Sequence, residues 1–209
     1  ENHFHIGLNV ASCPINCRFC SLAQKAGVFH KNIQFDEQQL LDWARQGEAQ
    51  GADALNLMTT GDFPFERLLE IGEFLKKAVG TPLVANTRDI DHREGEALLR
   101  AGFVGAYHAV RLGEGRDTPI PPQRRIQTIQ VLNDVGLLWM NCIEPVGPEH
   151  HPEEMVELML LARRYGAVYS GVMRRIQLLQ GVIVSLLVEQ HRRQAQPRQV
   201  PDLVLGVVD

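Results

Sequence analysis

The chain has 209 residues, of which 44% are hydrophobic, 22% charged and 6% aromatic, and its formal net charge at pH 7 is -4. This balance is ordinary for a globular protein with a sizeable core, and the scattered Lys and Arg residues offer no basic field for nucleic acid. No apolar run reaches the roughly 18 residues of a membrane span, and the polar start ENHFH is no signal peptide. We therefore expect a cytoplasmic protein with neither a nucleic acid nor a membrane as partner.

Apolar runs alternate with amphipathic stretches along the chain, which predicts strands and helices in turn. The first strand is expected within HFHIGLNVA, at residues 3–11. Each later strand follows a glycine that is expected to close the preceding helix in the left-handed conformation. These five strands are expected at residues 52–58, 81–87, 103–110, 137–144 and 167–173, after Gly51, Gly80, Gly102, Gly136 and Gly166.

Helix starts fall between these strands. Asp36 and Asp91 are suited to cap helices, and Pro64 and Pro152 are suited to a first turn. Alternation of this kind predicts a parallel sheet with helices outside, either an open doubly wound sheet or a (β/α) barrel. About six units can be recognised. We therefore expect an α/β fold of the partial TIM-type barrel kind, with its chemistry at the carboxyl ends of the strands.

The end of the chain departs from this pattern. Residues 1–176 form the expected barrel core, whereas residues 177–209 show no clear seventh and eighth unit and at most one helix, near residues 182–193. We interpret this segment as an altered or incomplete end of the barrel. Residue 1 is Glu and not Met, so the start is also expected to have been trimmed.

Three of the four cysteines lie close together in ASCPINCRFCSLA, at residues 11–23. Their spacing is C-x3-C-x2-C, directly after a strand. Cysteines clustered in one loop indicate a metal or redox site, and three thiolates on a four-iron cubane would leave one iron free for a small chelating molecule. A tetrahedral zinc site completed by His5 or His30 is the alternative, although the usual second pair of zinc ligands is missing.

With Phe19 just before the last cysteine, this motif resembles that of the radical S-adenosylmethionine enzymes, and the resemblance extends over roughly residues 3–176. It implies a [4Fe-4S] cluster held by Cys13, Cys17 and Cys20, with S-adenosylmethionine chelating the fourth iron through its amino and carboxylate groups. Reductive cleavage of that cofactor would yield a 5′-deoxyadenosyl radical that takes hydrogen from a small amino acid or cofactor precursor. An electron donor such as flavodoxin or ferredoxin is then implied as partner.

The turn after the second barrel strand stands where the family has a Gly-Gly-Glu-like motif. The resemblance implies that this turn holds the amino group of S-adenosylmethionine, through Thr60, Gly61 and Asp62. A plain turn between strand and helix is the alternative, since Gly and Asp are common in turns.

HAVRLGEG and the following PPQRRIQTIQ resemble the biotin synthase-like branch of the family, which includes biotin synthase, the [FeFe]-hydrogenase maturase and 3-methylornithine synthase. In that branch an acid meets the ribose and an arginine meets the methionine carboxylate. The matching positions are Glu114 and Arg125, with Arg111 and Arg124 beside them. The alternative is that the arginine pair belongs to a solvated helix start.

Other polar residues near the strand ends form a candidate substrate shell, and each of them is equally suited to a structural role. The candidates are Asn86, Arg88, His108, Cys142, Glu144 and Arg174. Cys142 alone cannot hold the second, sulfur-donating cluster of biotin synthase, so sulfur insertion is not expected. No catalytic residue can be assigned.

Two other classes of function compete with this one. The first is a non-catalytic remnant that holds an iron-sulfur or zinc centre in an incomplete barrel. The second is a metal-independent aldolase-like barrel, which the absence of a lysine at a strand end disfavours because no Schiff base could form.

Overall fold

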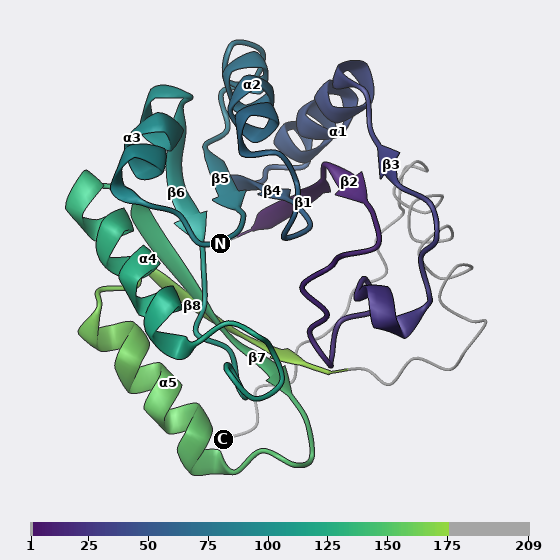
Figure 1. Cartoon of the computed structure of the whole chain (residues 1–209). Helices are drawn as coiled ribbons and strands as arrows, with labels where there is room; N and C mark the ends of the chain where they lie inside the picture. The colour runs from purple at the N-terminus through teal and green to yellow at the C-terminus, as the bar shows by residue number, and fades with distance from the viewer. Residues whose placement is uncertain (1, 176–209) are drawn as a thin grey trace, which may run out of the picture. The chain divides into compact units, whose positions relative to one another are not determined.

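Six parallel strands form one curled sheet in a computed structural model that describes residues 2–175. The strands follow one another in chain order across the sheet. They are β1 (His3–Gly7), β4 (Ala54–Met58), β5 (Leu83–Asn86), β6 (Phe103–Tyr107), β7 (Leu138–Val146) and β8 (Tyr169–Arg174). The predicted partial (β/α) barrel is confirmed, because each strand pairs in parallel with the next and the sheet curls as part of a barrel wall (Figure 1).

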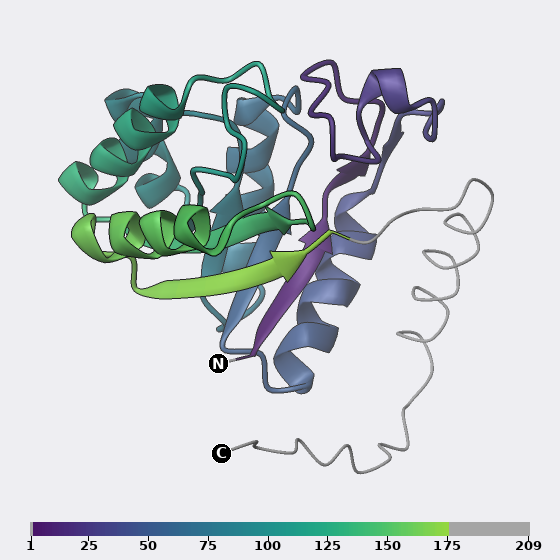
Figure 2. The ribbon, with the colours of Figure 1, turned by 90° about the horizontal axis from the view of Figure 1, so that it is seen from below.

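Five helices cover the outer face of this sheet (Figures 1 and 2). They are α1 (Glu37–Ala49), α2 (Phe65–Lys76), α3 (His92–Arg100), α4 (Pro122–Val135) and α5 (Pro152–Arg164). Asp36 and Asp91 cap α1 and α3, and each accepts a hydrogen bond of 2.9 Å from the backbone N–H three residues on. This satisfies donors that the first helical turn leaves without partners.

The prediction that a glycine in the left-handed conformation ends each helix is confirmed at four positions and wrong at one. Gly51, Gly102, Gly136 and Gly166 have positive φ. Gly80 does not, because α2 already ends at Lys76. The Gly80 backbone N–H instead donates a 2.7 Å hydrogen bond to Oε1 of Glu48 at the end of α1. Gly80 therefore joins two units of the barrel rather than closing a helix.

The main core lies between the sheet and the helices, and its packing is close. Leu55, Leu83, Phe103 and Trp139 are almost wholly buried there. Gly72 in α2 faces the Phe103 ring so closely that a Cβ atom would lie 2.4 Å from the ring. The absence of a side chain at Gly72 therefore lets α2 approach the sheet.

The inner face of the curl carries polar as well as apolar side chains. Asn56 on β4 is 1% exposed, and its Nδ2 lies 3.4 Å from ring nitrogens of both His3 and His5 on β1. The ring centroids of His3 and Tyr169 are 5.1 Å apart, so the two edge strands β1 and β8 come into contact across the curl.

The segment predicted as the first strand is divided into two. Only β1 belongs to the curled sheet, because Asn9–Val10 (β2) turns away and pairs antiparallel with Ile33–Gln34 (β3). The cysteine loop spans the interval between β2 and β3 and includes a short 3-10 helix, Gln24–Ala26.

Within residues 2–175, no helix combines the length and apolar character that crossing a membrane requires. The predicted altered end, residues 177–209, lies outside the described residues.

Candidate active site

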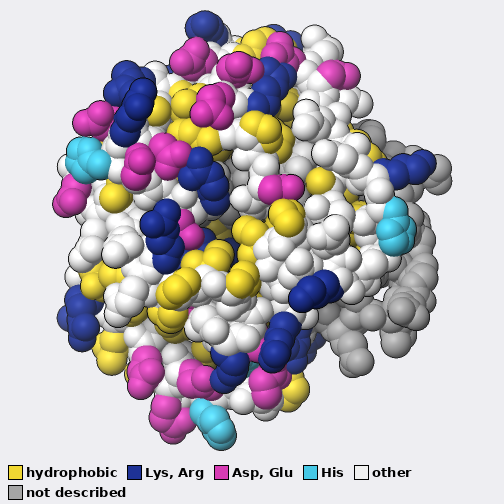
Figure 3. Space-filling model, in the orientation of Figure 1, with side chains coloured by type: hydrophobic (Ala, Val, Ile, Leu, Met, Phe, Trp, Pro, Cys, Tyr) yellow, Lys and Arg dark blue, Asp and Glu magenta, His cyan; other side chains and the backbone are white. Residues whose placement is uncertain are grey.

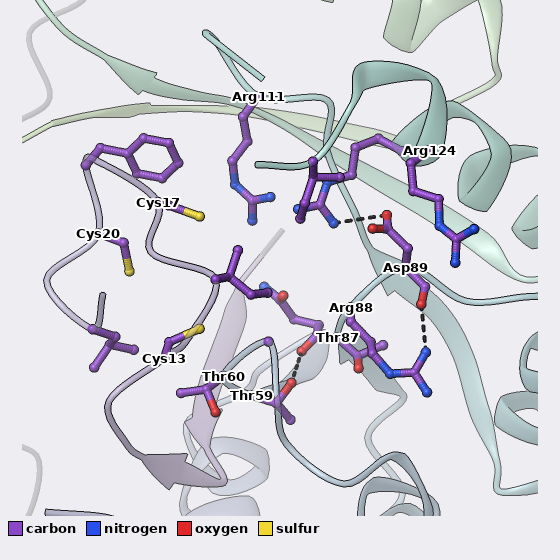
Figure 4. Close-up of a pocket in the computed structure, with 17 residues that line it drawn as sticks. Cys13, Cys17, Cys20, Thr59, Thr60, Thr87, Arg88, Asp89, Arg111 and Arg124 are labelled. Atoms are coloured by element: carbon purple, nitrogen blue, oxygen red, sulfur yellow. Dashed lines mark hydrogen bonds and ion pairs between the residues drawn. The ribbon is translucent and has the colours of Figure 1, made fainter. Parts of the chain in front are cut away.

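The cysteine loop is closed on itself by backbone hydrogen bonds. The Cys13 N–H donates to the Leu22 carbonyl at 2.6 Å, and the Gln24 N–H donates back to the Cys13 carbonyl at 2.9 Å. The Cys20 N–H donates to the Cys17 carbonyl at 3.1 Å. Together these bonds curl residues 13–24 into one turn-rich loop, with all three cysteines on it (Figure 4).

Asn16 shapes the tightest part of this loop. Its φ of 58° is in the left-handed region, which asparagine tolerates better than most residues. The Asn16 side chain donates to the Pro14 carbonyl and accepts from the Lys25 N–H, both at 2.8 Å. One side chain thus braces both limbs of the loop.

The loop packs against two neighbouring segments, which contain Gly61 and Asp117. A Cβ atom at Gly61, just after β4, would lie 2.1 Å from Cδ1 of Ile15 and 3.7 Å from the Cys13 sulfur. On the other side, the Arg18 N–H donates to the Asp117 carbonyl at 2.8 Å. Glycine is therefore needed at position 61 for Ile15, which stands between the first two cysteines, to settle against the end of β4.

A pocket of about 470 Å³ opens beside the loop at the carboxyl ends of the strands. The cysteine loop, the segments that follow β4, β5 and β6, and the start of α4 line it (Figure 4). A space-filling view shows a central hollow with basic side chains at its rim (Figure 3). The fold therefore brings together the strand-end segments that the sequence analysis selected.

All three cysteines line this pocket as free, half-buried thiols. Burial raises the pKa of Cys17 and of Cys20, and at Cys17 the nearby Arg111 guanidinium opposes that rise. Among residues 2–175, no group of three or more His, Cys, Asp or Glu side chains is arranged to hold a single metal ion.

Thr60 and Gly61 line the pocket, whereas Asp62 does not. Thr60 is 5% exposed, and its hydroxyl accepts from Nδ2 of Asn9 at 2.7 Å and donates to Oδ1 of Asp62 at 2.8 Å. This short network ties β2 to the turn after β4. Two of the three residues predicted to hold an amino group are thus at the pocket, and the carboxylate is turned toward Thr60.

Glu114 and Arg125, predicted to meet the ribose and a carboxylate, are buried against each other. Arg125 Nε lies 3.3 Å from Oε2 of Glu114, and the two side chains are 6% and 1% exposed. Arg125 Nη1 also lies 3.1 Å from Oδ1 of Asp89, and the Thr118 hydroxyl donates to Glu114. Arg125 lines the pocket but Glu114 does not, because its carboxylate is enclosed by these partners.

His108 belongs to the same buried cluster and does not line the pocket. Its side chain is 5% exposed, and Nε2 lies 3.3 Å from Oδ1 of Asp89 without reaching hydrogen-bond geometry. Burial lowers the pKa of His108, and the positive charge of Arg125 lowers it further, against the opposing effect of Asp89. The ring is therefore neutral at physiological pH.

A second polar cluster extends from the pocket into the curl of the sheet. Arg111 lines the pocket, and its Nε lies 3.2 Å from Oε1 of Glu144. The other Glu144 oxygen accepts from the Tyr107 hydroxyl at 3.1 Å. Cys142, beside them, is buried, and burial raises its pKa to about 11. Glu144 and Cys142 thus lie behind Arg111 and not on the pocket wall.

Of the remaining substrate candidates, two reach the pocket. Asn86 and Arg88 line it, and Arg88 is held by a double hydrogen bond to Glu94, with Nη2 to Oε1 at 2.5 Å and Nη1 to Oε2 at 3.2 Å. Arg174 is exposed on the edge strand β8 and does not line the pocket. Arg124, which the sequence analysis named as a neighbour of Arg125, does line it.

Several pocket residues were missed by the sequence analysis. Asp89 lies three residues beyond β5, and Thr59 and Thr87 each directly follow a barrel strand. Thr59 and Thr87 share the position after a strand with the residues that were selected, so that position alone was a usable signal. Nothing in the stretch NTRDI distinguishes Asp89 from a surface acid, because its partner Arg125 is 36 residues away.

Comparison with curated proteins finds similarity to biotin synthases, although no family model matches the chain. Biotin synthase of Pelotomaculum thermopropionicum is 27% identical over 125 residues, which cover 52% of this chain and 38% of that protein. Biotin synthase of Acetivibrio thermocellus is 27% identical over 111 residues, which cover 49% and 33%. The chain spans about a third of the length of these curated relatives.

Comparison with solved structures shows the same fold at lower identity. Methylornithine synthase (PylB) has a TM-score of 0.73 at 13% identity, with 83% of this chain and 53% of that chain covered. HydG, a maturase of the [FeFe]-hydrogenase, has a TM-score of 0.69 at 10% identity, with 88% and 44% covered. The radical S-adenosylmethionine methyltransferase TsrM from Kitasatospora setae, solved with cobalamin and a [4Fe-4S] cluster, scores 0.56 at 15% identity, with 84% and 34% covered.

These matches agree with the motif in the cysteine loop, and the chain resembles the radical S-adenosylmethionine superfamily. Within that superfamily it resembles the biotin synthase-like branch, by sequence through the biotin synthases and by fold through PylB and HydG. The predicted resemblance is confirmed at both levels.

Proposed function

We propose that this chain forms the cofactor-binding part of a radical S-adenosylmethionine enzyme. In this proposal, Cys13, Cys17 and Cys20 hold a [4Fe-4S] cluster, and S-adenosylmethionine occupies the pocket beside it. The observation that carries the proposal is the presence of three free, half-buried thiols on one braced loop at the carboxyl edge of a curled parallel sheet, next to a pocket of about 470 Å³. The fold likeness to PylB, HydG and TsrM supports it.

The donor set fits a cluster better than a zinc ion. A tetrahedral zinc ion needs four ligands within about 2.3 Å of one point, and no described group of His, Cys, Asp or Glu is arranged in that way. His5, one candidate for a fourth ligand, instead lies inside the curl beside Asn56. Three thiols spread around a loop are suited to a [4Fe-4S] cluster, which is larger than a single ion and whose fourth iron is then left to a cofactor.

The residues of the chain then have distinct tasks. The Gly61 turn and Asn16 hold the loop in place, and the pocket wall binds and orients the cofactor while excluding water. When bound, the cluster and S-adenosylmethionine supply one-electron chemistry that generates a 5′-deoxyadenosyl radical. Arg111, backed by Glu144, places a positive charge between the cysteine loop and the inside of the curl.

We further propose that the substrate is a small molecule, such as an amino acid or cofactor precursor, and that a flavodoxin or ferredoxin supplies the electron. Arg88 and Asn86, which line the pocket, are the candidate substrate contacts. A cytoplasmic setting is part of the proposal, since free thiols persist in reducing compartments.

Product analysis tests the proposal directly. Protein reconstituted with iron and sulfide under anaerobic conditions, then reduced with dithionite, is expected to convert S-adenosylmethionine to 5′-deoxyadenosine and methionine. A Cys17→Ser variant is expected to form no 5′-deoxyadenosine, whereas Cys142→Ser, which changes a buried thiol away from the pocket wall, is expected to keep the activity. A fully loaded protein that forms no 5′-deoxyadenosine contradicts the catalytic proposal and favours a non-catalytic cluster-binding role.

A further inference from the structure

Two histidines and an asparagine lie side by side on the inner face of the curled sheet. Phe4 and Ile6 of β1 pack in the core between the sheet and the helices. His3 and His5 alternate with them along the strand and so lie on the opposite, inner face. His5 stands directly beside Asn56 of β4 in the parallel register. The three side chains are therefore neighbours on one face of two adjacent strands.

Both histidine rings approach the same end of the Asn56 side chain. Nδ1 of His3 and Nε2 of His5 each lie 3.4 Å from Asn56 Nδ2, which is longer than the usual 2.7–3.2 Å or so of a hydrogen bond. Asn56 is 1% exposed, and its Oδ1 atom has no hydrogen-bond partner among residues 2–175. In this orientation the buried amide is poorly satisfied by its neighbours.

Rotation of the Asn56 amide by half a turn changes what the rings meet. The amide oxygen then stands where Nδ2 stands, beside both ring nitrogens. Two imidazole nitrogens and one carbonyl oxygen then face one another. Such a set can share ring N–H hydrogen bonds with the oxygen, or all three atoms can bind one cation.

The separations favour a cation. Two ligand atoms that are each about 2.1 Å from a tetrahedral ion lie about 3.4 Å apart, which is the distance from the amide to each ring. Imidazole is neutral above its ordinary pKa of about 6.5 and is then a preferred ligand of zinc and its neighbours in the transition series. Zinc ions with three protein ligands take water as the fourth.

The surroundings fix the ligands and leave a route to them. The His3 ring lies against the Tyr169 ring of β8, with centroids 5.1 Å apart and planes inclined by 30°. Contacts of this kind orient a metal ligand. His5 is exposed, so an ion and a water molecule can reach the site from the inside of the curl.

We propose that His3 Nδ1, His5 Nε2 and the amide oxygen of Asn56 bind one divalent transition-metal ion of the zinc type, with water as the fourth ligand. None of these residues lines the pocket beside the cysteine loop, so the site is separate from that of the proposed function and does not depend on it. It gives the inner face of the sheet a positive charge and one exchangeable ligand position.

Zinc binding tests this inference once the cysteine loop cannot contribute. The whole 209-residue chain without an affinity tag, carrying Cys13→Ser, Cys17→Ser and Cys20→Ser together, is titrated with Zn²⁺ by isothermal titration calorimetry at pH 7.5. One Zn²⁺ per chain is expected to bind. X-ray absorption at the zinc edge is expected to show two imidazole ligands and no sulfur.

Single changes in this background assign the ligands. His3→Gln and His5→Gln are each expected to weaken Zn²⁺ binding about a hundredfold or more, and Asn56→Leu about tenfold, because each removes one ligand. The matched control is His92→Gln, which changes an exposed histidine on α3 and is expected to leave the affinity unchanged.

Two results would overturn the inference. One is the absence of stoichiometric Zn²⁺ binding or the presence of a sulfur ligand, and the other is equal affinity in His5→Gln and His92→Gln. If the triple serine variant does not fold, the same titration of wild-type protein whose cysteines already hold a cluster gives the test. Failure to form that cluster contradicts the proposed function alone, so the two failures are distinguishable.

Discussion

Charged residues beneath the pocket neutralise one another, and this determines which of them remain available. Arg125 is shared between Asp89 and Glu114, and both Arg125 and Glu114 are almost wholly buried. Burying an ion pair costs desolvation free energy that only close partners offset, so removing one partner leaves an uncompensated charge. At the residue scale, the pair is a structural unit that fixes the wall of the pocket.

Glu114→Gln is therefore expected to act on stability. Because Arg125 keeps Asp89, the loss in the free energy of unfolding is expected to be about 3 kcal/mol, at the lower end for a broken buried pair. Chemical denaturation at pH 7 measures it. A loss below about 0.5 kcal/mol, combined with weaker binding of adenosine, would show instead that Glu114 is the ribose contact.

His108 makes stability depend on pH. Its pKa in the folded protein lies below the ordinary value of about 6.5, so the unfolded state binds more protons between those two values. Stability is then complete above that window and falls as the pH drops through it. Denaturation at pH 7.5 and pH 5.5 is expected to show a smaller fall for His108→Gln than for wild type.

The change at His108 separates its contribution from that of His5. Burial also lowers the pKa of His5, which adds a fall of the same sign in both proteins and so cancels in the comparison. If wild type and His108→Gln lose stability equally between the two pH values, His108 does not contribute as described.

The cysteines could be predicted at this scale, but the buried network could not. C-x3-C-x2-C is a local pattern, so the sequence alone predicts that Cys13, Cys17 and Cys20 lie together on one loop. Asp89 and Arg125 are paired across 36 positions, and nothing near either residue reveals the other. The exposure of Arg174 could not be predicted either, because it depends on which strand forms the edge of the sheet.

At the scale of elements, the contact between the cysteine loop and the turn after β4 is the critical junction. Ile15 occupies the space that a side chain at position 61 would need. Gly61→Ala is expected to push Ile15 away and to lower the iron content after reconstitution severalfold, while destabilising the fold by about 1–3 kcal/mol.

Gly7→Ala provides the matched control. Gly7 ends β1 at the same edge of the sheet, and a Cβ atom there meets nothing within 4 Å. This variant is expected to load iron as wild type does. Iron assay of both proteins under identical reconstitution gives the comparison, and equal loading of Gly61→Ala would show that the loop does not depend on this contact.

Most elements could be predicted because helices and barrel strands have strong local periodicity. The strands β4 to β8 overlap the predicted apolar runs, and α1, α2, α3 and α5 begin at or next to the predicted starts, whereas no start was predicted for α4. The β2–β3 pair could not be predicted, since each strand has two residues and its partner lies across the cysteine loop. Gly80 was misread because α2 ends before it and a contact with Glu48 decides its conformation.

At the scale of the whole molecule, the curled sheet explains why residues far apart in the sequence meet. Parallel strands in chain order bring every strand end to one edge, where the cysteine loop, the turn after β4, the segment after β5 and the start of α4 enclose one pocket. The fold likeness to PylB and HydG follows from this arrangement, at identities of 13% and 10%. The fold is thus shared although few side chains are the same.

The iron and inorganic sulfide content of anaerobically prepared protein tests the central claim most directly. We predict about four iron and four sulfide per chain, with an absorption band that dithionite bleaches, and loss of both in the Cys13→Ser, Cys17→Ser and Cys20→Ser variants. Stoichiometric zinc without sulfide, or unchanged iron content in all three variants, would contradict it.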